Sequence, residues 1–128
     1  MRFEHFKKLI PKIKNKSLPG YSAQLKLAPI GRSLQFNFQN QYKIAAVALI
    51  IYPDIEKETR LILIERNQYE GVHSGQVSFP GGKQEINDLS LVQTALRESN
   101  EEIGINLDSL TLLKKLSKIY IPPSNFLV

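Results

Sequence analysis

The stretch "FPGGKQEINDLSLVQTALRESNEEIGI", residues 79–105, crowds Glu98, Glu101 and Glu102 into five consecutive positions behind a glycine pair. Like charges three or four residues apart on a helix repel one another. Arg97 lies four positions before Glu101, so these two side chains can pair and offset part of the repulsion. The crowding predicts either a solvated acidic face with ordinary ion pairs or a group of carboxylates gathered around a cation.

Apolar spacing in this stretch predicts a helix over residues 89–103. Gly104 is placed to end it, because glycine is the usual residue just past a helix C-terminus. At about 100° per residue, Glu98 and Glu102 project together from one face. The neighbouring face, able to pack on a sheet, holds Val92, Leu96, Ser99 and Ile103, with Ala95 just outside it.

The glycine pair favours the second alternative, a group of carboxylates gathered around a cation. Gly81 and Gly82 follow a short predicted strand at residues 76–79, and glycine permits a close backbone approach and positive φ angles. Mg²⁺ prefers carboxylate oxygens and keeps waters that substrate phosphates can replace. We therefore expect Glu98 and Glu102 to hold a divalent cation, with a plain strand-to-helix turn as the alternative.

The remaining segments predict an α/β domain with strands around one central helix. An amphipathic helix is expected over residues 3–14, interrupted or kinked by Pro11, whereas residues 21–40 show no clean period. A turn is expected at residues 122–125. Further strands are predicted at residues 43–52, buried on both faces, at residues 60–65, and at residues 111–121, the last as one strand or a pair.

The net charge of +5 is unevenly distributed along the 128 residues. Residues 1–43 contain nine Lys or Arg and one acid, whereas residues 44–128 contain eight basic and eleven acidic groups. A basic lobe of this kind favours an anionic partner, and a solvated lysine-rich helix is the equal alternative.

Cysteine is absent from the sequence, which excludes disulfides, thiolate zinc sites and cysteine nucleophiles. The longest apolar run, residues 44–52, is under half of the roughly 20 residues that cross a bilayer. Residues 1–16 lack the apolar core and the cleavage site of a secretory signal. We expect a soluble, cytoplasmic protein.

Residues 81–105 resemble the Nudix box, the motif of the Nudix hydrolases, most closely in "RESNEEIGI". Ser99 stands where an aliphatic residue is usual. Arg97 lies one residue further from Gly82 than the general pattern places it, which leaves the acid Asp88 without an assigned role. The shifted spacing is similar to that of one subfamily, the coenzyme A diphosphatases.

An upstream stretch is also similar to that subfamily. Residues 61–82, "LILIERNQYEGVHSGQVSFPGG", contain an aliphatic strand, then Arg66, Gly75 and the "FPGG" turn of its signature. Asn67 and Gly71 depart from it, because a small and a basic residue are common at these two positions.

The resemblance covers at least residues 43–125 and implies a Nudix fold, a mixed β-sheet packed between helices as an α/β/α sandwich. It divides the chain into an N-terminal basic helix and extended segment, residues 1–40, and a Nudix domain, residues 41–128. The implied activity is hydrolysis of a diphosphate linkage with Mg²⁺ or Mn²⁺. In the subfamily, coenzyme A or acyl-CoA is cleaved to 4′-phosphopantetheine and adenosine 3′,5′-bisphosphate.

The resemblance also implies roles for individual residues. Glu98 and Glu102 would be the principal metal ligands, and Glu101 a further ligand or the base that orients the attacking water. Arg97 would hold one of these glutamates in place. The expected substrate-binding residues are Arg66, Gly81 and Gly82, together with Lys26 and Arg32 of the basic lobe for the 3′-phosphate of coenzyme A.

Two other functions stay open at this point. The nearest is hydrolysis of another nucleoside diphosphate derivative, such as ADP-ribose, a dinucleotide or an RNA cap. The other is a non-catalytic Nudix-like module that binds nucleic acid or an anionic membrane through the basic helix. Because the glutamates are intact, we expect a small-molecule diphosphate substrate and neither a membrane nor a nucleic-acid partner.

The sequence stops in the apolar residues of "KIYIPPSNFLV", whereas polar tails are common at natural termini. Members of the subfamily it resembles continue for several dozen residues past this point. We therefore expect a chain truncated at its C-terminus, with an incomplete sheet whose exposed edge favours a homodimer. Residues 121–126 are expected either to line the substrate pocket or only to cap a strand.

Overall fold

The computed structural model describes residues 1–31, 41–66 and 75–128 of the chain. A four-stranded sheet lies at its centre, with β1 antiparallel to β6, parallel to β8, and β8 antiparallel to β7. The sheet is therefore mixed, and the predicted α/β fold is confirmed. In order across the sheet, the strands are β6 (Gly81–Lys83), β1 (Lys43–Val47), β8 (Phe126–Leu127) and β7 (Tyr120–Ile121).

Two segments predicted as single strands are each divided in the structure. The chain changes its pairing partner within both of them: β1 pairs with β6, β2 with β3, and β4 with β5. The bounds of these short strands are β2 (Ile51–Pro53), β3 (Thr59–Leu61), β4 (Ile64–Glu65) and β5 (Val77–Ser78).

The prediction of a strand buried on both faces at residues 43–52 was wrong. Ala45 and Ala46, on opposite faces of β1, are buried, but Val47 at its end and Leu49 just after it are 42% and 44% exposed. The buried hydrophobic residues among those described are few, namely Phe6, Ala45, Ala46 and Ile50.

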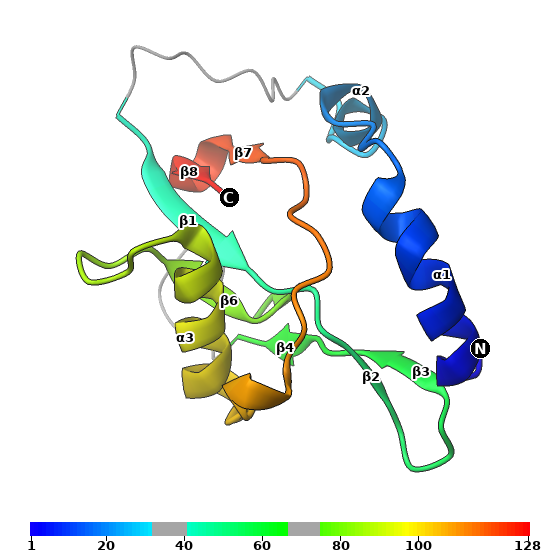
Figure 1. The fold of residues 1–128 in the computed structure, drawn as a ribbon. Helices are drawn as coiled ribbons and strands as arrows, with labels where there is room; N and C mark the ends of the chain where they lie inside the picture. Colours follow the sequence, from blue (N-terminus) through cyan, green and yellow to red (C-terminus); the bar gives the residue numbers. More distant parts are fainter. Residues whose placement is uncertain (32–40, 67–74) are drawn as a thin grey trace.

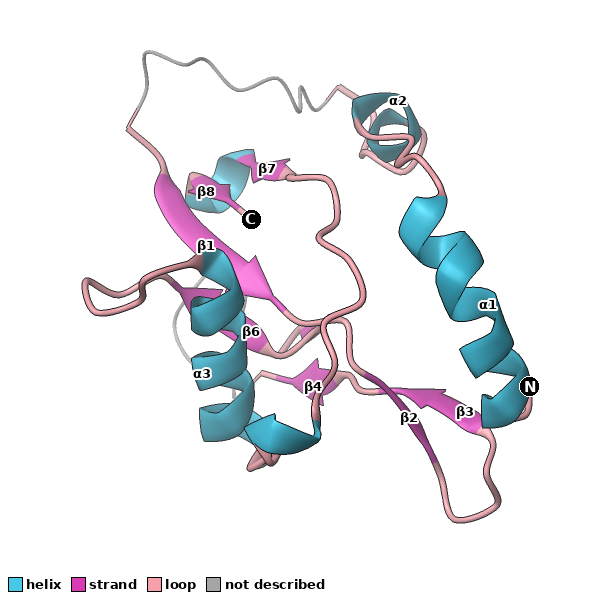
Figure 2. Ribbon diagram, viewed as in Figure 1, coloured by secondary structure: helices cyan, strands magenta, loops and turns pink. Residues whose placement is uncertain are grey.

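Helix α3 (Leu91–Ile103) packs against β1 and β6 (Figure 2), as the sequence predicted. The side chain of Ser90 caps its start by accepting a hydrogen bond from the N–H of Gln93 at 3.2 Å. Gly104 ends it in the left-handed conformation with φ 62°. The most buried α3 side chains are two small hydroxyl residues, Thr94 and Ser99, so the helix approaches the sheet closely.

Helix α1 (Phe3–Asn15) is confirmed, and it continues through Pro11 rather than ending there. Its first turn is held by the loop between β2 and β3, where the N–H of Phe3 donates to the carbonyl of Lys57 at 2.9 Å. The short helix α2 (Tyr21–Leu25) follows in a region without a clean sequence period. Figure 1 shows both helices on the opposite side of the molecule from α3. None of the helices in the described ranges is long and apolar enough to cross a membrane.

The segment after α3 corrects the prediction of a strand over residues 111–121. A 3-10 turn, η1 (Leu107–Ser109), comes first, and only β7 at the end of the segment joins the sheet. The stretch between η1 and β7 contacts the C-terminal end of α1 through Lys114. Its ammonium donates to carbonyls at that end, which have no partner within the helix. The predicted turn at residues 122–125 is confirmed by the 3-10 turn η2 (Pro122–Ser124).

Candidate active site

The site is built where α3 approaches the glycine pair of β6. The N–H of Gly81 donates to Oε2 of Glu102 at 2.8 Å. The carboxylate of Glu98 lies against Gly82, where a Cβ atom would meet both of its oxygens at 2.5 Å. Two carboxylates from successive turns of one helix thus lie beside adjacent backbone units of one strand.

Glycine permits the close approach at these two positions for different reasons. Gly81 has φ 148°, and a Cβ there would collide with the carbonyl oxygen of Ala46 on β1. Gly82 has an ordinary φ, but its hydrogen faces Glu98 in a space too small for a methyl group. The predicted close approach to the backbone of the glycine pair is therefore present, and the approaching group at Gly82 is the Glu98 carboxylate.

Arg97 binds the acidic groups around this site. Its guanidinium forms a bidentate pair with Asp88, with N–O distances of 2.9 and 3.1 Å. Nη1 also contacts Oε1 of Glu98 at 3.0 Å and Oε2 of Glu101 at 3.3 Å, and Nη2 donates to the carbonyl of Lys83 at 3.0 Å. The predicted pairing of Arg97 with Glu101 is confirmed, and Arg97 holds Glu98 as well.

Asp88 is the residue of this site that the sequence left unassigned. Its side chain is 4% exposed, and it accepts from the N–H of Glu85 at 2.9 Å as well as from Arg97. The Arg97 guanidinium, helped by that N–H, holds the pKa of Asp88 well below its usual range. The same pair raises the pKa of Arg97. In the sequence, Asp88 is an acid six positions after Gly82, as the general pattern requires. Its pairing with Arg97 was not predicted, because Arg97 lies one residue later than that pattern places it.

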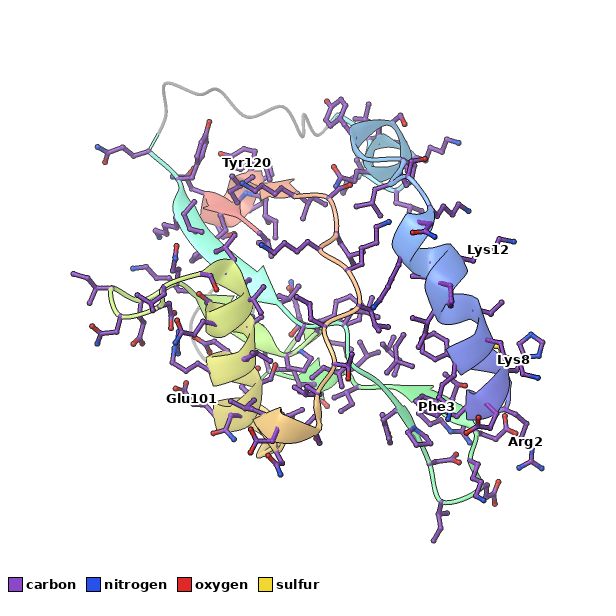
Figure 3. The ribbon with its side chains drawn as sticks, viewed as in Figure 1. Arg2, Phe3, Lys8, Lys12, Glu101 and Tyr120 are labelled. Carbon is purple, nitrogen blue, oxygen red and sulfur yellow. The ribbon has the colours of Figure 1, made fainter. Side chains whose placement is uncertain are left out.

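Glu101 is separated from the other two glutamates of the cluster. Its side chain is 57% exposed, and Arg97 is its partner within the described part of the chain. In Figure 3 it lies on the outer side of α3. The structure therefore brings Glu98 and Glu102 to the glycine pair and leaves Glu101 beside them in contact with solvent.

The donor set has the chemistry of a site for a hard divalent cation. Over residues 1–31, 41–66 and 75–128, no three His, Asp or Glu groups converge as a ready-made ligand set. Glu98 and Glu102 supply two carboxylates, and Mg²⁺ is commonly bound by one or two carboxylates with waters and substrate phosphates completing its shell. Among the described residues, Glu98 and Glu102 are therefore the candidates to hold such an ion.

The predicted substrate-binding residues lie in different parts of the fold. Arg66 follows β4 and donates from Nε to Oγ of Ser78 at 3.3 Å, three positions before Gly81. Lys26 caps the end of α2 and is exposed. Arg32 lies outside the described residues.

Lys26 is not brought to the carboxylates. Gln24 of α2 donates to the carbonyl of Lys118 at 2.9 Å, so α2 lies near the β7 edge of the sheet. The glycine pair is on β6 at the opposite edge. Three strand spacings, about 14 Å, separate these edges.

An apolar cavity of 250 Å³ lies between α2 and the β7–η2 segment. Its lining includes Leu27, Pro29, Ile119, Ile121 and Pro122. Part of the predicted segment 121–126 therefore lines a cavity as well as forming a turn. This cavity is at the β7 edge and does not include the glutamates.

Comparison with known proteins gives the family. A protein-family model described as "NUDIX domain" matches residues 42–128. The chain belongs to the Nudix domain family, whose fold agrees with the mixed sheet and the helix on its glycine pair.

Its curated relatives include proteins described as "Uncharacterized Nudix hydrolase NudL". The chain is 33% identical to the one from Yersinia enterocolitica and 37% identical to those from Yersinia pestis and Yersinia pseudotuberculosis, each over 84 residues. These matches cover 66% of this chain and 40% or 41% of the relatives. The matched part thus spans about two fifths of the length of these relatives.

The contact between Gly82 and Glu98 generates a first prediction. Gly82→Ala should lower the free energy of unfolding by about 1–3 kcal/mol, because the added methyl group must displace the Glu98 carboxylate. In a Glu98→Ala background the same substitution should cost much less, giving a coupling of at least about 1 kcal/mol in a double-mutant cycle. Urea denaturation of the four proteins measures both values. Equal costs in the two backgrounds would show that Glu98 does not occupy this space.

The Asp88–Arg97 pair predicts a pH dependence. A carboxylate whose pKa is lowered by folding stabilises the folded state above its unfolded pKa, about 4, and this contribution disappears as the pH falls below that value. Asp88→Asn should therefore be less stable than the original chain at neutral pH, and the two stabilities should converge in acid. Urea denaturation from about pH 7 to about pH 2 tests this.

Glu85→Gln is the matched control for that experiment, because Glu85 is 63% exposed and lies 3.8 Å from Arg97. It should leave the stability curve nearly unchanged. A difference between Asp88→Asn and the original chain that stays constant at every pH would contradict the assignment.

Proposed function

We propose that this domain hydrolyses a diphosphate linkage with the help of Mg²⁺ or Mn²⁺, and that its substrate is coenzyme A or an acyl-CoA. The observation that carries the proposal is the placement of Glu98 and Glu102 beside Gly81 and Gly82. Membership of the Nudix family and the relatives described as Nudix hydrolases support the reaction class.

Glu98 and Glu102 hold the cation in this proposal. When bound, a divalent cation neutralises the diphosphate oxygens and lowers the pKa of a coordinated water. The Gly81 N–H fixes the orientation of Glu102, and Arg97 fixes that of Glu98, so neither carboxylate must be ordered when substrate arrives.

Glu101 is proposed as the base of the reaction. Its carboxylate is exposed, so water reaches it, and Arg97 limits its movement. In this role one of its oxygens orients the attacking water and accepts its proton. Asp88 takes no part in the chemistry; it positions Arg97, which in turn positions the two glutamates that it contacts.

The assignment of coenzyme A rests on the resemblance of residues 61–82 and on the basic lobe. Arg66 contacts Ser78, three positions before Gly81, and is proposed to hold the diphosphate. Lys26 and Arg32 are proposed to bind the 3′-phosphate, which requires the substrate to extend from the glycine pair toward the opposite edge of the sheet.

Substitution of a glutamate tests the reaction. Glu102→Gln keeps an oxygen for the Gly81 N–H but removes the charge, so it should preserve the fold and lower turnover at least about a hundredfold. Glu56→Gln, an exposed change in the β2–β3 turn, is the control and should leave turnover unchanged. The assay follows coenzyme A cleavage with Mg²⁺ and Mn²⁺ and identifies products by mass. Near-normal turnover by Glu102→Gln would refute its role as a metal ligand.

A second comparison tests the substrate. Neutralising Lys26 and Arg32 together should raise KM for coenzyme A more than for dephospho-coenzyme A, because only the former carries the 3′-phosphate. Equal changes for the two compounds would reject this role for the lobe. ADP-ribose and dinucleotides belong in the same assay, and faster turnover of either would replace coenzyme A as the substrate.

A further inference from the structure

Two lysine-rich segments, far apart in the sequence, are joined in the fold. Residues 5–31 contain six lysines, residues 109–128 contain three, and neither segment contains an acid. The ammonium of Lys114 donates to the carbonyl of Lys14 at 2.9 Å, and Gln24 donates to the carbonyl of Lys118 at 2.9 Å. These contacts hold α1, α2 and the later segment against one another.

We refer to the exposed lysines of these joined segments, apart from Lys26 with its proposed substrate role, as the lysine face. They are Lys7, Lys8, Lys12, Lys14, Lys16, Lys115 and Lys118. Of these, only Lys7 has a carboxylate partner within the described ranges, Glu4 at 2.6 Å. Figure 3 shows Lys8 and Lys12 on the outer side of α1, away from Glu101 on α3. Most of this positive charge is therefore neither neutralised by the protein nor directed at the carboxylate site.

The same segments carry exposed aliphatic side chains. Leu27 is 90% exposed, and Leu112 and Leu116 are 60% and 59% exposed in the segment that carries Lys115. Tyr21 of α2 is 41% exposed, and tyrosine suits an interface with one apolar and one wet side. The surface thus combines positive charge with apolar groups that gain free energy when they leave water.

This composition distinguishes two kinds of anionic partner. Single-stranded nucleic acid is bound largely by base stacking on aromatic side chains and by arginine. Residues 5–31 and 109–128 contain lysines and no arginine, and their exposed large hydrophobic residues are mainly leucines. Lysines mixed with aliphatic groups are typical of protein surfaces that bind anionic lipid headgroups and insert shallowly below them.

We propose that the lysine face docks the protein on an anionic lipid membrane. The proposal is independent of the catalytic function and revises the expectation of no membrane partner, which rested on the intact glutamates rather than on this surface. The apolar face of α1 takes no part, because Phe6 is buried against the protein. Contact is made by the outer lysines and the exposed leucines, so the protein lies on the membrane and does not span it.

Vesicle co-sedimentation with the 128-residue chain tests the proposal. We expect binding to vesicles of phosphatidylglycerol and phosphatidylcholine, weakened by salt, and no binding to phosphatidylcholine alone. A lysine near an anionic surface contributes about a fivefold change in partitioning, so Lys8→Gln with Lys12→Gln should weaken binding about thirtyfold. Leu27→Ser should weaken it about tenfold through lost apolar contact.

Lys57→Asn is the control, because Lys57 lies outside both segments at φ 62°, a conformation that asparagine adopts readily. It should change binding less than twofold, and circular dichroism should show all variants folded. No binding to the anionic vesicles at low salt would overturn the proposal. So would binding that is insensitive to the two lysine substitutions. Binding of single-stranded RNA, but not vesicles, with no effect of Leu27→Ser would overturn it in favour of a nucleic-acid partner.

Discussion

The close approach of α3 to β6 is the constraint on which the site depends. Gly82 leaves room for only a hydrogen atom beside the Glu98 carboxylate, and the φ of 148° at Gly81 is one that a residue with a side chain rarely adopts. The helix can come this near because Thr94 and Ser99, its most buried residues, are small and satisfy their hydroxyls on carbonyls one turn earlier. The contact between α3 and β6 that packs the helix on the sheet therefore also positions its carboxylates.

Arg97 explains why the chain tolerates so many acids on one short helix. A single guanidinium contacts Asp88, Glu98 and Glu101, which removes much of the repulsion that their spacing would otherwise cause. Glu102 is outside this group and uses the Gly81 N–H instead. Arg97 thus offsets the charge of Asp88, Glu98 and Glu101, whereas Glu102 has only the Gly81 N–H among the described residues. In the proposed function, a divalent cation beside the glycine pair would offset the remaining negative charge of the glutamates and of the bound diphosphate.

Local sequence signals predicted the elements that local interactions control. Helices α1 and α3, the stop at Gly104 and the Arg97–Glu101 pair all depend on residues within a few positions of one another. All are confirmed, with the helix ends within two residues of the predicted ones. The divided strands could not be predicted, because the break depends on a change of pairing partner. The attachment of Lys114 to α1 joins residues about a hundred positions apart and leaves no periodic signal. The metal-binding and substrate-binding roles stay predictions.

In the proposed function, Glu98 and Glu102 together form a site for a divalent cation. Isothermal titration of Mn²⁺ into the 128-residue chain, without substrate, measures binding at this site apart from activity. One site is expected, and its heat should disappear in the Glu98→Gln, Glu102→Gln double variant, while circular dichroism shows that variant folded. An unchanged Mn²⁺ titration in the double variant, or no binding by the original chain, would contradict this assignment.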